Sequence, residues 1–401
     1  MSSLSRFLRG TFNISTIRRF SSAATVASET TATSAVSAAI SPPQKSLASI
    51  VNGERNPKQI VEKFKKACES ERFRNNIAVY DRTVRRLVAA KRLHFVEEIL
   101  EEQKKYRDMS KEGFAARIIS LYGKAGLFEN AQKVFDEMPD RNCKRSVLSF
   151  NALLSAYRLS KKFDVVEELF NELPGKLSIK PDIVSYNTLI KALCEKDSLP
   201  EAVALLDEIE NKGLKPDIVT FNTVLLSSYL KGQFELGEEI WAKMVEKNVT
   251  IDIRTYNARL LGLAYEVRSK ELLSLFEELQ ASGIKPDVYS FNAMIRGSIN
   301  EGKMDEAESW YKEIMKHGYR PDKATFALLL PAMCKAGDFE SAIELCKETF
   351  SKRYLVGQAT LQKVVDELVK GSKREEAEEI AEIAKTNDFL KFNLNLPSQE
   401  E

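Results

Sequence analysis

The stretch of the chain from residue 183 to residue 217 reads IVSYNTLIKALCEKDSLPEAVALLDEIENKGLKPD. Apolar residues recur at helical spacing in its first half, around Leu189 and Leu193, and again in its second half, around Leu206 and Ile209. A polar turn separates the two halves, and a Pro-Asp pair at the end prevents the second helix from continuing. The stretch therefore predicts two helices joined by a turn.

The same pattern recurs along the chain. An aromatic residue followed by asparagine returns at intervals of 36, 35, 35 and 35 residues. A Lys-Pro-Asp or Arg-Pro-Asp triplet keeps step with it, except in one copy, which reads Thr-Ile-Asp. Self-similarity at a fixed period of this length is the signature of a solenoid. We predict nine helical hairpins, at residues 77–111, 112–146, 147–182, 183–217, 218–252, 253–287, 288–322, 323–357 and 358–392.

Several details of these hairpins are predictable. Small residues at a matching place in the second helices, such as Ala202 and Gly237, are expected where two helices approach closely. The extra residue of the 36-residue interval, near Pro174, is expected in the loop between two hairpins. Residues 41–76 are expected to form a helical cap, and residues 393–401 a C-terminal tail. The first helices are expected to be N-capped by Ser149, Ser185, Thr220, Thr255, Ser290, Thr325 and Thr360.

Composition excludes several classes of protein. The 401 residues are 43% hydrophobic and 29% charged, and no run approaches the length of about 18 apolar residues that a membrane-spanning helix needs. No membrane insertion is expected. The chain has two histidines and five cysteines, without metal-binding spacing or close cysteine pairs. Neither a metal site, a disulfide framework nor a catalytic centre is expected from them, and no cofactor or small-molecule substrate is predicted.

The first forty residues are typical of a transit peptide. They contain four arginines and one acidic residue, and more than half of them are Ser, Thr or Ala. Leu4, Phe7, Leu8 and Phe12 share one helical face, which favours mitochondrial import. Residues 1–40 are therefore predicted to be a disordered mitochondrial transit peptide. Because the whole chain has a net charge of +2, the remainder is close to neutral, and any binding of nucleic acid must depend on a local surface.

The repeats resemble a known family. The run IVSYNTLI at 183–190, the triplet ALC at 192–194, the pair EA at 201–202 and GLKPD at 213–217 look like the pentatricopeptide repeat (PPR) of the pure, 35-residue type. The resemblance extends over residues 77–392. It implies an all-α fold, a right-handed α-solenoid superhelix of helix-turn-helix repeats, in which one repeat addresses one base of single-stranded RNA.

The resemblance also implies which residues meet the RNA. In PPR proteins the fifth and the last residue of a repeat read the base, and the pair of asparagine and aspartate favours uracil. Five consecutive repeats carry this pair, which predicts recognition of a short pyrimidine tract. The RNA-binding residues implied are Asn151 with Asp182, Asn187 with Asp217, Asn222 with Asp252, Asn257 with Asp287, and Asn292 with Asp322.

Other features of the repeats weaken this interpretation. An acidic residue at a repeat end also favours the N-terminus of the next helix, so helix capping alone explains part of the pattern. PPR repeats often place a phosphate-binding lysine at the thirteenth position, but lysine stands there only at Lys124 and Lys335. The thirteenth positions of the five Asn/Asp repeats hold Leu159, Glu195, Leu230, Tyr265 and Asn300.

Three functions remain open. The short array, its few phosphate lysines and the absence of room for an effector domain after Phe392 resemble the small PPR proteins of the plant mitochondrial ribosome. That resemblance implies a non-enzymatic protein of the small ribosomal subunit that contacts ribosomal RNA and mitochondrial ribosomal proteins. A free factor for the stability, processing or translation of one mitochondrial transcript is the alternative. A protein-binding scaffold is the third hypothesis.

Overall fold

The computed structural model describes residues 46–396, and the chain divides into two compact units, Met1–Lys196 and Asp197–Glu401. The division falls between the two helices of the hairpin predicted at 183–217. The predicted transit peptide, residues 1–40, lies outside the described residues. Every regular element between residues 46 and 396 is a helix, so the predicted all-α class is confirmed.

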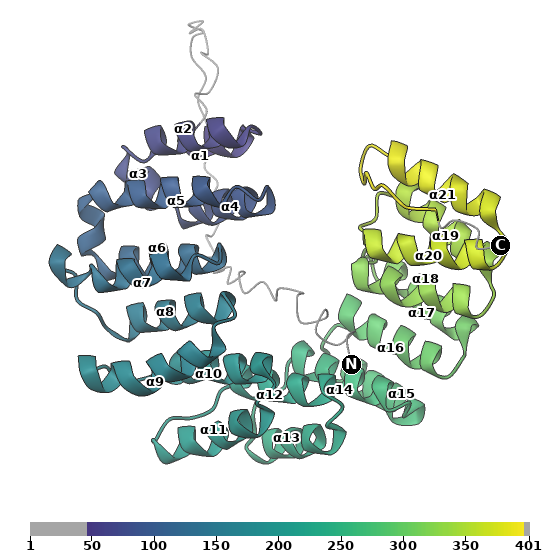
Figure 1. Ribbon diagram of the computed structural model, residues 1–401. Coiled ribbons are helices and arrows are strands. Elements are labelled where there is room, and N and C mark those ends of the chain that lie inside the picture. Colours follow the sequence, from purple (N-terminus) through teal and green to yellow (C-terminus); the bar gives the residue numbers. More distant parts are fainter. Residues whose placement is uncertain (1–45, 397–401) are drawn as a thin grey trace, which may run out of the picture. The chain divides into compact units, whose positions relative to one another are not determined.

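The first unit is a series of antiparallel helix pairs that follow one another in chain order (Figure 1). The first helices of successive pairs contact each other, α4 with α6, α6 with α8, and α8 with α10. The α-helices are α1 Leu47–Gly53, α2 Pro57–Ala67, α3 Glu71–Arg74, α4 Ile77–Ala89, α5 Leu93–Glu101, α6 Glu112–Lys124, α7 Phe128–Asp136, α8 Val147–Leu159, α9 Phe163–Leu177 and α10 Ile183–Lys196. Short 3-10 helices are η2 Glu102–Lys105, η3 Arg107–Ser110 and η4 Pro139–Arg141.

The second unit repeats this arrangement. Its first helices α12, α14, α16, α18 and α20 contact one another in succession, and each also packs on the second helix of its own pair. Its helices are α11 Leu199–Asn211, α12 Ile218–Leu230, α13 Phe234–Glu246, α14 Ile253–Tyr265, α15 Ser269–Ala281, α16 Val288–Asn300, α17 Met304–Lys316, α18 Lys323–Lys335, α19 Phe339–Ser351, α20 Gln358–Lys370 and α21 Arg374–Thr386.

The aromatic residue of each aromatic-Asn pair belongs to the core. Phe150, Phe221 and Phe291 are at most 1% exposed. Because successive residues of a helix point about 100° apart, the asparagine that follows each ring is turned away from the core. The burial of the ring therefore determines which face of the first helix carries the asparagine.

Two glycines allow helices of the second unit to approach each other closely. Tyr229 of α12 lies between Gly237 of α13 and Gly262 of α14. A Cβ atom at Gly237 would stand 2.4 Å from the Tyr229 ring, and one at Gly262 would stand 2.3 Å from it. The close approach predicted for Gly237 is therefore confirmed, and larger side chains at these two places would push the helices apart.

The extra residue of the 36-residue interval does not lie in a loop, and the prediction for it was wrong. Pro174 lies inside α9, which has 15 residues where most second helices have 13. The helix continues through Pro174 and ends at Ser178, in the left-handed conformation with φ of 52°. Ile179 N–H then donates to the Pro174 carbonyl at 3.0 Å. The insertion is thus accommodated by a longer helix.

Before residue 77 the described chain forms the three helices α1, α2 and α3. Phe64 of α2 makes edge-to-face contacts with Phe73 of α3 and with Tyr80 of α4, at centroid distances of 5.3 and 4.8 Å. These rings connect the short helices to the first long pair, an arrangement that is consistent with a cap.

Candidate nucleic-acid interface

Aspartates begin most of the first helices of the second unit. Asp217, Asp252, Asp287 and Asp322 are the N-cap residues of α12, α14, α16 and α18, and each forms a capping box with the Ser or Thr three residues later. In α16, for example, Asp287 Oδ1 accepts from Ser290 N–H at 3.2 Å while Asp287 N–H donates to Ser290 Oγ at 3.1 Å. In these four repeats the aspartate at the repeat end therefore initiates the following helix.

The expected N-caps were therefore assigned three residues too late. Thr220, Thr255, Ser290 and Thr325 are the third residues inside their helices, and all four are fully buried. The reason is that a capping box contains two residues that both favour caps, and the aspartate takes the outer place. Ser149 of α8 and Ser185 of α10 are also third residues of their helices, and the N-cap of α20 is Gly357, which has no side chain to cap it.

Asparagines of the preceding first helix complete these capping boxes. Asn257 Nδ2 of α14 donates to Asp287 Oδ1 at 2.9 Å, and Asn257 Oδ1 accepts from Ser290 Oγ at 2.6 Å. Asn222 is bound in the same way by Asp252 and Thr255, at 3.1 and 2.8 Å. Each amide therefore joins two stacked helices, and both of its polar atoms have a partner.

Two further pairs have the same geometry. Asn292 donates to Asp322 at 3.2 Å and accepts from Thr325 at 2.8 Å. In the first unit, Asn151 donates to Asp182 at 2.9 Å and accepts from Ser185 Oγ at 2.5 Å. The two members of the remaining pair, Asn187 and Asp217, belong to different units. The structure thus brings together four of the five predicted pairs within a unit.

These networks leave part of each amide unused by the bonds described. A side-chain amide has two N–H donors and two acceptor lone pairs, and the network uses one of each. The side chains of Asn151, Asn222 and Asn257 lie at half-buried positions, whereas Asn292 is 7% exposed. One donor and one acceptor therefore remain on an amide whose orientation is held by its neighbours. This is the complement of a pyrimidine edge such as the N–H and C=O of uracil.

The second residue of several repeats is an exposed apolar or aromatic side chain. Leu148, Val184 and Tyr289 are 51%, 52% and 57% exposed, and Arg254 takes the same place in its repeat. Each lies near the start of a first helix, three residues before the asparagine of its repeat. The fifth-place asparagines and the aspartates paired with them are called the row, and its asparagines are Asn151, Asn187, Asn222, Asn257 and Asn292. Side chains of these types offer flat or apolar surface against which an unpaired base can pack.

Glu112 performs the joining role where no Asn/Asp pair exists. It begins α6 and reaches α8, where its Oε1 accepts from Ser146 N–H and Ser146 Oγ, both at 2.8 Å. The same oxygen accepts from Ser149 N–H at 3.2 Å and Ser149 Oγ at 2.8 Å. Burial tends to raise the pKa of Glu112, but the hydrogen bonds from Ser149 and Ser146 outweigh it, so the pKa lies below its usual value.

The thirteenth positions offer few free cations. Lys124 forms an ion pair with Asp81. Tyr265 lies under the guanidinium of Arg296, whose carbon is 4.7 Å from the ring centroid. Glu195 is bound by Arg158 at 2.5 Å. At these three repeats the thirteenth position is therefore occupied by contacts within the chain.

Exposed lysines stand instead in the loops that precede the first helices. Lys180, Lys215 and Lys285 are exposed, and none of them forms an ion pair with another residue of the 46–396 region. Each lies two residues before an aspartate of the row. The Lys-Pro-Asp triplet is a marker of the repeat, and its lysine also places a positive charge near the start of the next helix.

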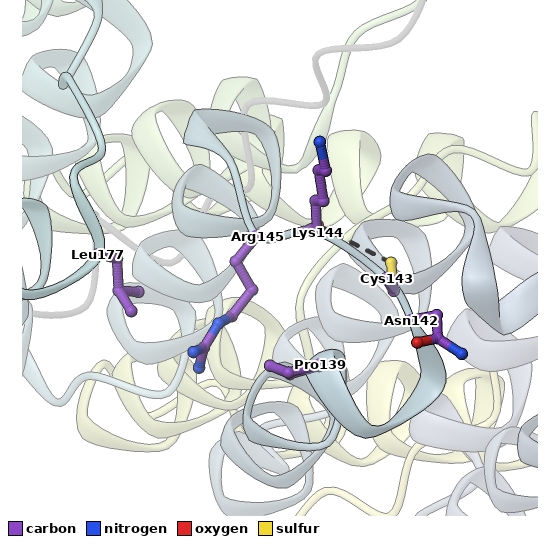
Figure 2. Close-up of a pocket in the computed structure, with 6 residues that line it drawn as sticks. All are labelled: Pro139, Asn142, Cys143, Lys144, Arg145 and Leu177. Atoms are coloured by element: carbon purple, nitrogen blue, oxygen red, sulfur yellow. Dashed lines mark hydrogen bonds between the residues drawn. The ribbon is translucent and has the colours of Figure 1, made fainter.

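Basic residues also line a hollow of about 520 Å³ in the first unit (Figure 2). It is bordered by Pro139, Asn142, Cys143, Lys144, Arg145 and Leu177. Arg145 extends between Pro139 and Leu177, and its guanidinium lies 5.2 Å from the Phe135 ring centroid. The lining contains two cations and no acidic side chain, which suits an anionic partner.

The described residues were also compared with the requirements of a metal site and of a membrane-spanning helix. Between residues 46 and 396, no cluster of three His, Cys, Asp or Glu side chains could hold a metal ion. None of the helices in that range has both the length and the apolarity needed to span a bilayer. All five cysteines lie between residues 46 and 396, where they are buried and form no disulfide, and burial raises the pKa of the Cys334 thiol to about 11.

Family models match much of this repeat region. The PPR repeat family matches residues 181–227 and 286–335, a pentatricopeptide repeat domain matches 133–196, and a PPR repeat model matches 117–143 and 219–249. The chain carries pentatricopeptide repeats over these residues. The resemblance inferred from the sequence is thus confirmed, and the helix pairs within the matched residues are PPR helix pairs.

Curated PPR relatives come from Arabidopsis thaliana. Small ribosomal subunit protein mS78 (rPPR3a) is 91% identical over 214 residues, and small ribosomal subunit protein mS79 (rPPR3b) is 68% identical over 217 residues. Each match covers 53% of this chain and 53% of the relative, so the aligned part spans about half the length of these relatives. A further PPR protein, whose name includes the word mitochondrial, is 38% identical over 164 residues, 41% of each chain.

One solved structure is similar to this chain. PPR10 from maize, in complex with an 18-nucleotide psaJ RNA element, is similar with a TM-score of 0.49 and 19% sequence identity. The match covers 84% of this chain and 59% of that one.

Proposed function

We propose that this PPR protein is a non-catalytic component of the small subunit of the plant mitochondrial ribosome, where it contacts ribosomal RNA. The names of the two relatives with 91% and 68% identity support the ribosomal assignment. The mitochondrial address is supported by the composition of residues 1–40 and by the mitochondrial relative. Neighbouring ribosomal proteins are its proposed protein partners.

The proposed array has nine repeats over residues 77–392, in the segments predicted from the period. The helix bounds support this division, because each segment contains one pair of consecutive helices, from α4 with α5 to α20 with α21. The central five repeats would carry the RNA-facing row. The repeats on either side would serve mainly to extend the stack.

The row of oriented amides is the observation that carries RNA binding. Four asparagines are held in one geometry by an aspartate and a hydroxyl, with one donor and one acceptor left over on each. Such a row would meet the edges of consecutive unpaired bases, one for each repeat, with a preference for uracil. Loop lysines such as Lys215 and Lys285 would supply the phosphate contacts that the thirteenth positions lack.

Sedimentation of the tagged protein from a mitochondrial lysate tests the ribosomal role. We expect it to sediment with the small ribosomal subunit, and to leave that fraction when magnesium is chelated and the subunit loses its structure. Slow sedimentation with a footprint on one transcript would instead support the free RNA factor, which the uninterrupted row of Asn/Asp pairs also favours. Slow sedimentation without any bound RNA would support the protein scaffold.

Binding of a uridine-rich oligonucleotide tests the row itself. Replacing both Asn222 and Asn257 by alanine should weaken binding by about 1 kcal/mol for each lost contact, because a base edge then loses its partner. Asn211→Ala is the matched control, since Asn211 is exposed at the end of α11 and lies outside the row. An unchanged affinity of the double variant would reject base contact by these repeats.

A further inference from the structure

The chain turns back after its last helix. Asn387 ends α21, and its side chain accepts from the backbone N–H groups of Phe389 and Leu390 at 2.9 and 3.0 Å. Phe392 N–H then donates to the Ala384 carbonyl at 2.9 Å. These bonds reverse the chain, and the residues that follow lie against α20, the first helix of the last hairpin.

Two glutamines of α20 hold this returning segment by its backbone. Gln358 Nε2 donates to the Asn393 carbonyl at 3.0 Å. Gln362 Nε2 donates to the Asn395 carbonyl at 2.7 Å, and Gln362 Oε1 accepts from Asn395 N–H at 2.9 Å. The Gln362 amide and the Asn395 backbone thus form a closed pair with one donor and one acceptor on each side.

The spacing of the two glutamines matches the spacing of an extended chain. Residues four apart in a helix are separated by about 6 Å along its axis. Residues two apart in an extended chain are separated by about 6.6 Å. Gln358 and Gln362 therefore meet Asn393 and Asn395 in register. Because the bonds are to the backbone, this surface recognises extended polypeptide and not particular side chains.

Gln362 is the fifth residue of the hairpin at 358–392. Asn222, Asn257 and Asn292 take the same position in their repeats. Its second N–H donates to Asp366 Oδ1 at 2.8 Å, so both of its donors are used. A base could bind there only after Asn395 had left.

We propose that the last repeat binds the chain's own segment 393–395 in place of a nucleotide. In an extended chain the N–H and the C=O of one residue point the same way, as the N–H and C=O on the edge of uracil do, and Gln362 pairs with those of Asn395 as an amide would pair with a base. The part of this inference that concerns RNA rests on the proposed function. The RNA-facing row then ends at Asn292 and Asp322, since the intervening repeat has Ala327 at its fifth place.

Residue-resolved hydrogen exchange of the full chain tests the docking without RNA. Asn395 N–H should be protected in the wild type, and Gln362→Ala should speed its exchange about fivefold, the equivalent of one net hydrogen bond. Lys363→Ala is the control, because Lys363 is exposed on the same helix and should leave Asn395 unchanged. Exchange of Asn395 at the rate of an unstructured peptide in the wild type would overturn the docking.

Oligouridines of five and seven nucleotides test the replacement of a nucleotide. Asn395→Pro removes the Asn395 N–H that donates to Gln362 and should release the Gln362 side chain. Gln362 is the fifth residue of its repeat, and that repeat is the seventh counted from the one that contains Asn151. The affinity ratio of the seven-nucleotide to the five-nucleotide RNA should then rise about fivefold over the wild-type ratio. Adding Gln362→Ala should cancel the rise.

The two parts of the inference fail in different ways. An unchanged ratio in Asn395→Pro would overturn the claim that the segment stands in for a nucleotide. Failure of the wild type to bind either oligouridine would count against the proposed RNA function and would likewise remove the nucleotide-replacement claim. The hydrogen-exchange result would still decide whether segment 393–395 is docked on α20.

Discussion

Two junctions between stacked first helices use different chemistry for the same task. At the start of α16, Asp287 caps the helix and Asn257 of α14 binds both Asp287 and Ser290. At the start of α8, Ser146 is the cap, and Glu112 of α6 binds it and Ser149. In both, a polar side chain of one helix satisfies the N-terminus of the next.

The difference lies in what each junction leaves for a ligand. Glu112 Oε1 accepts four hydrogen bonds and an ionised carboxylate has no donor to offer. Asn257 keeps one N–H and one lone pair after its structural bonds are made. Joining the helices therefore explains why a polar residue is present, but only the amide can also meet the edge of a base.

The largest expected effect is at Glu112. Glu112→Ala removes one acceptor from four donors and should lower the free energy of unfolding of the chain by about 2 kcal/mol. Thermal unfolding followed by circular dichroism measures it. Glu112→Gln is the control, because it keeps an acceptor oxygen and should lose less than half as much. Equal losses in both variants would mean that charge, and not hydrogen bonding, joins α6 to α8.

A smaller effect is expected at Asp287. Asp287→Ala removes an N-cap and releases Asn257, which should lower the free energy of unfolding by about 1 kcal/mol. Asp287→Ser retains a capping oxygen and should recover most of the loss, while the anchor for Asn257 is weakened. Uridine binding should then remain impaired although stability returns. Full recovery of both properties would show that the anchor contributes nothing to RNA contact.

The smallest effect depends on pH and should appear only at the carboxylate junction. The pKa of Glu112 is lowered in the folded state, so its stabilising contribution is complete above the unfolded value of 4.5 and is lost as pH falls through the folded pKa. The stability difference between the wild type and Glu112→Gln should therefore shrink as the pH falls below about 4.5. A difference that stays constant over this range would contradict the assignment.

Much of the array was predictable, because its determinants are local. The period, the buried aromatic residues and the helix pairs follow from residues a few positions apart, and all nine predicted segments contain a helix pair. The prediction for Pro174 failed because proline and glycine usually mark loops, whereas here α9 is simply longer. The Ser and Thr caps were assigned wrongly because both members of a capping box have the same local preference.

Local sequence patterns do not predict the contacts that define the site. Glu112 acts on a residue 34 positions away, and Gln362 on one 33 positions away, and neither pairing has a marker in the sequence. A regular spacing of residues is enough to specify helices and their buried faces, because those depend on neighbours along the chain. The stacking of helices decides which asparagine amides are anchored, which carboxylate has its lone pairs occupied and which repeat binds its own chain. Stacking alone brings groups about 30 residues apart in the sequence within hydrogen-bond distance.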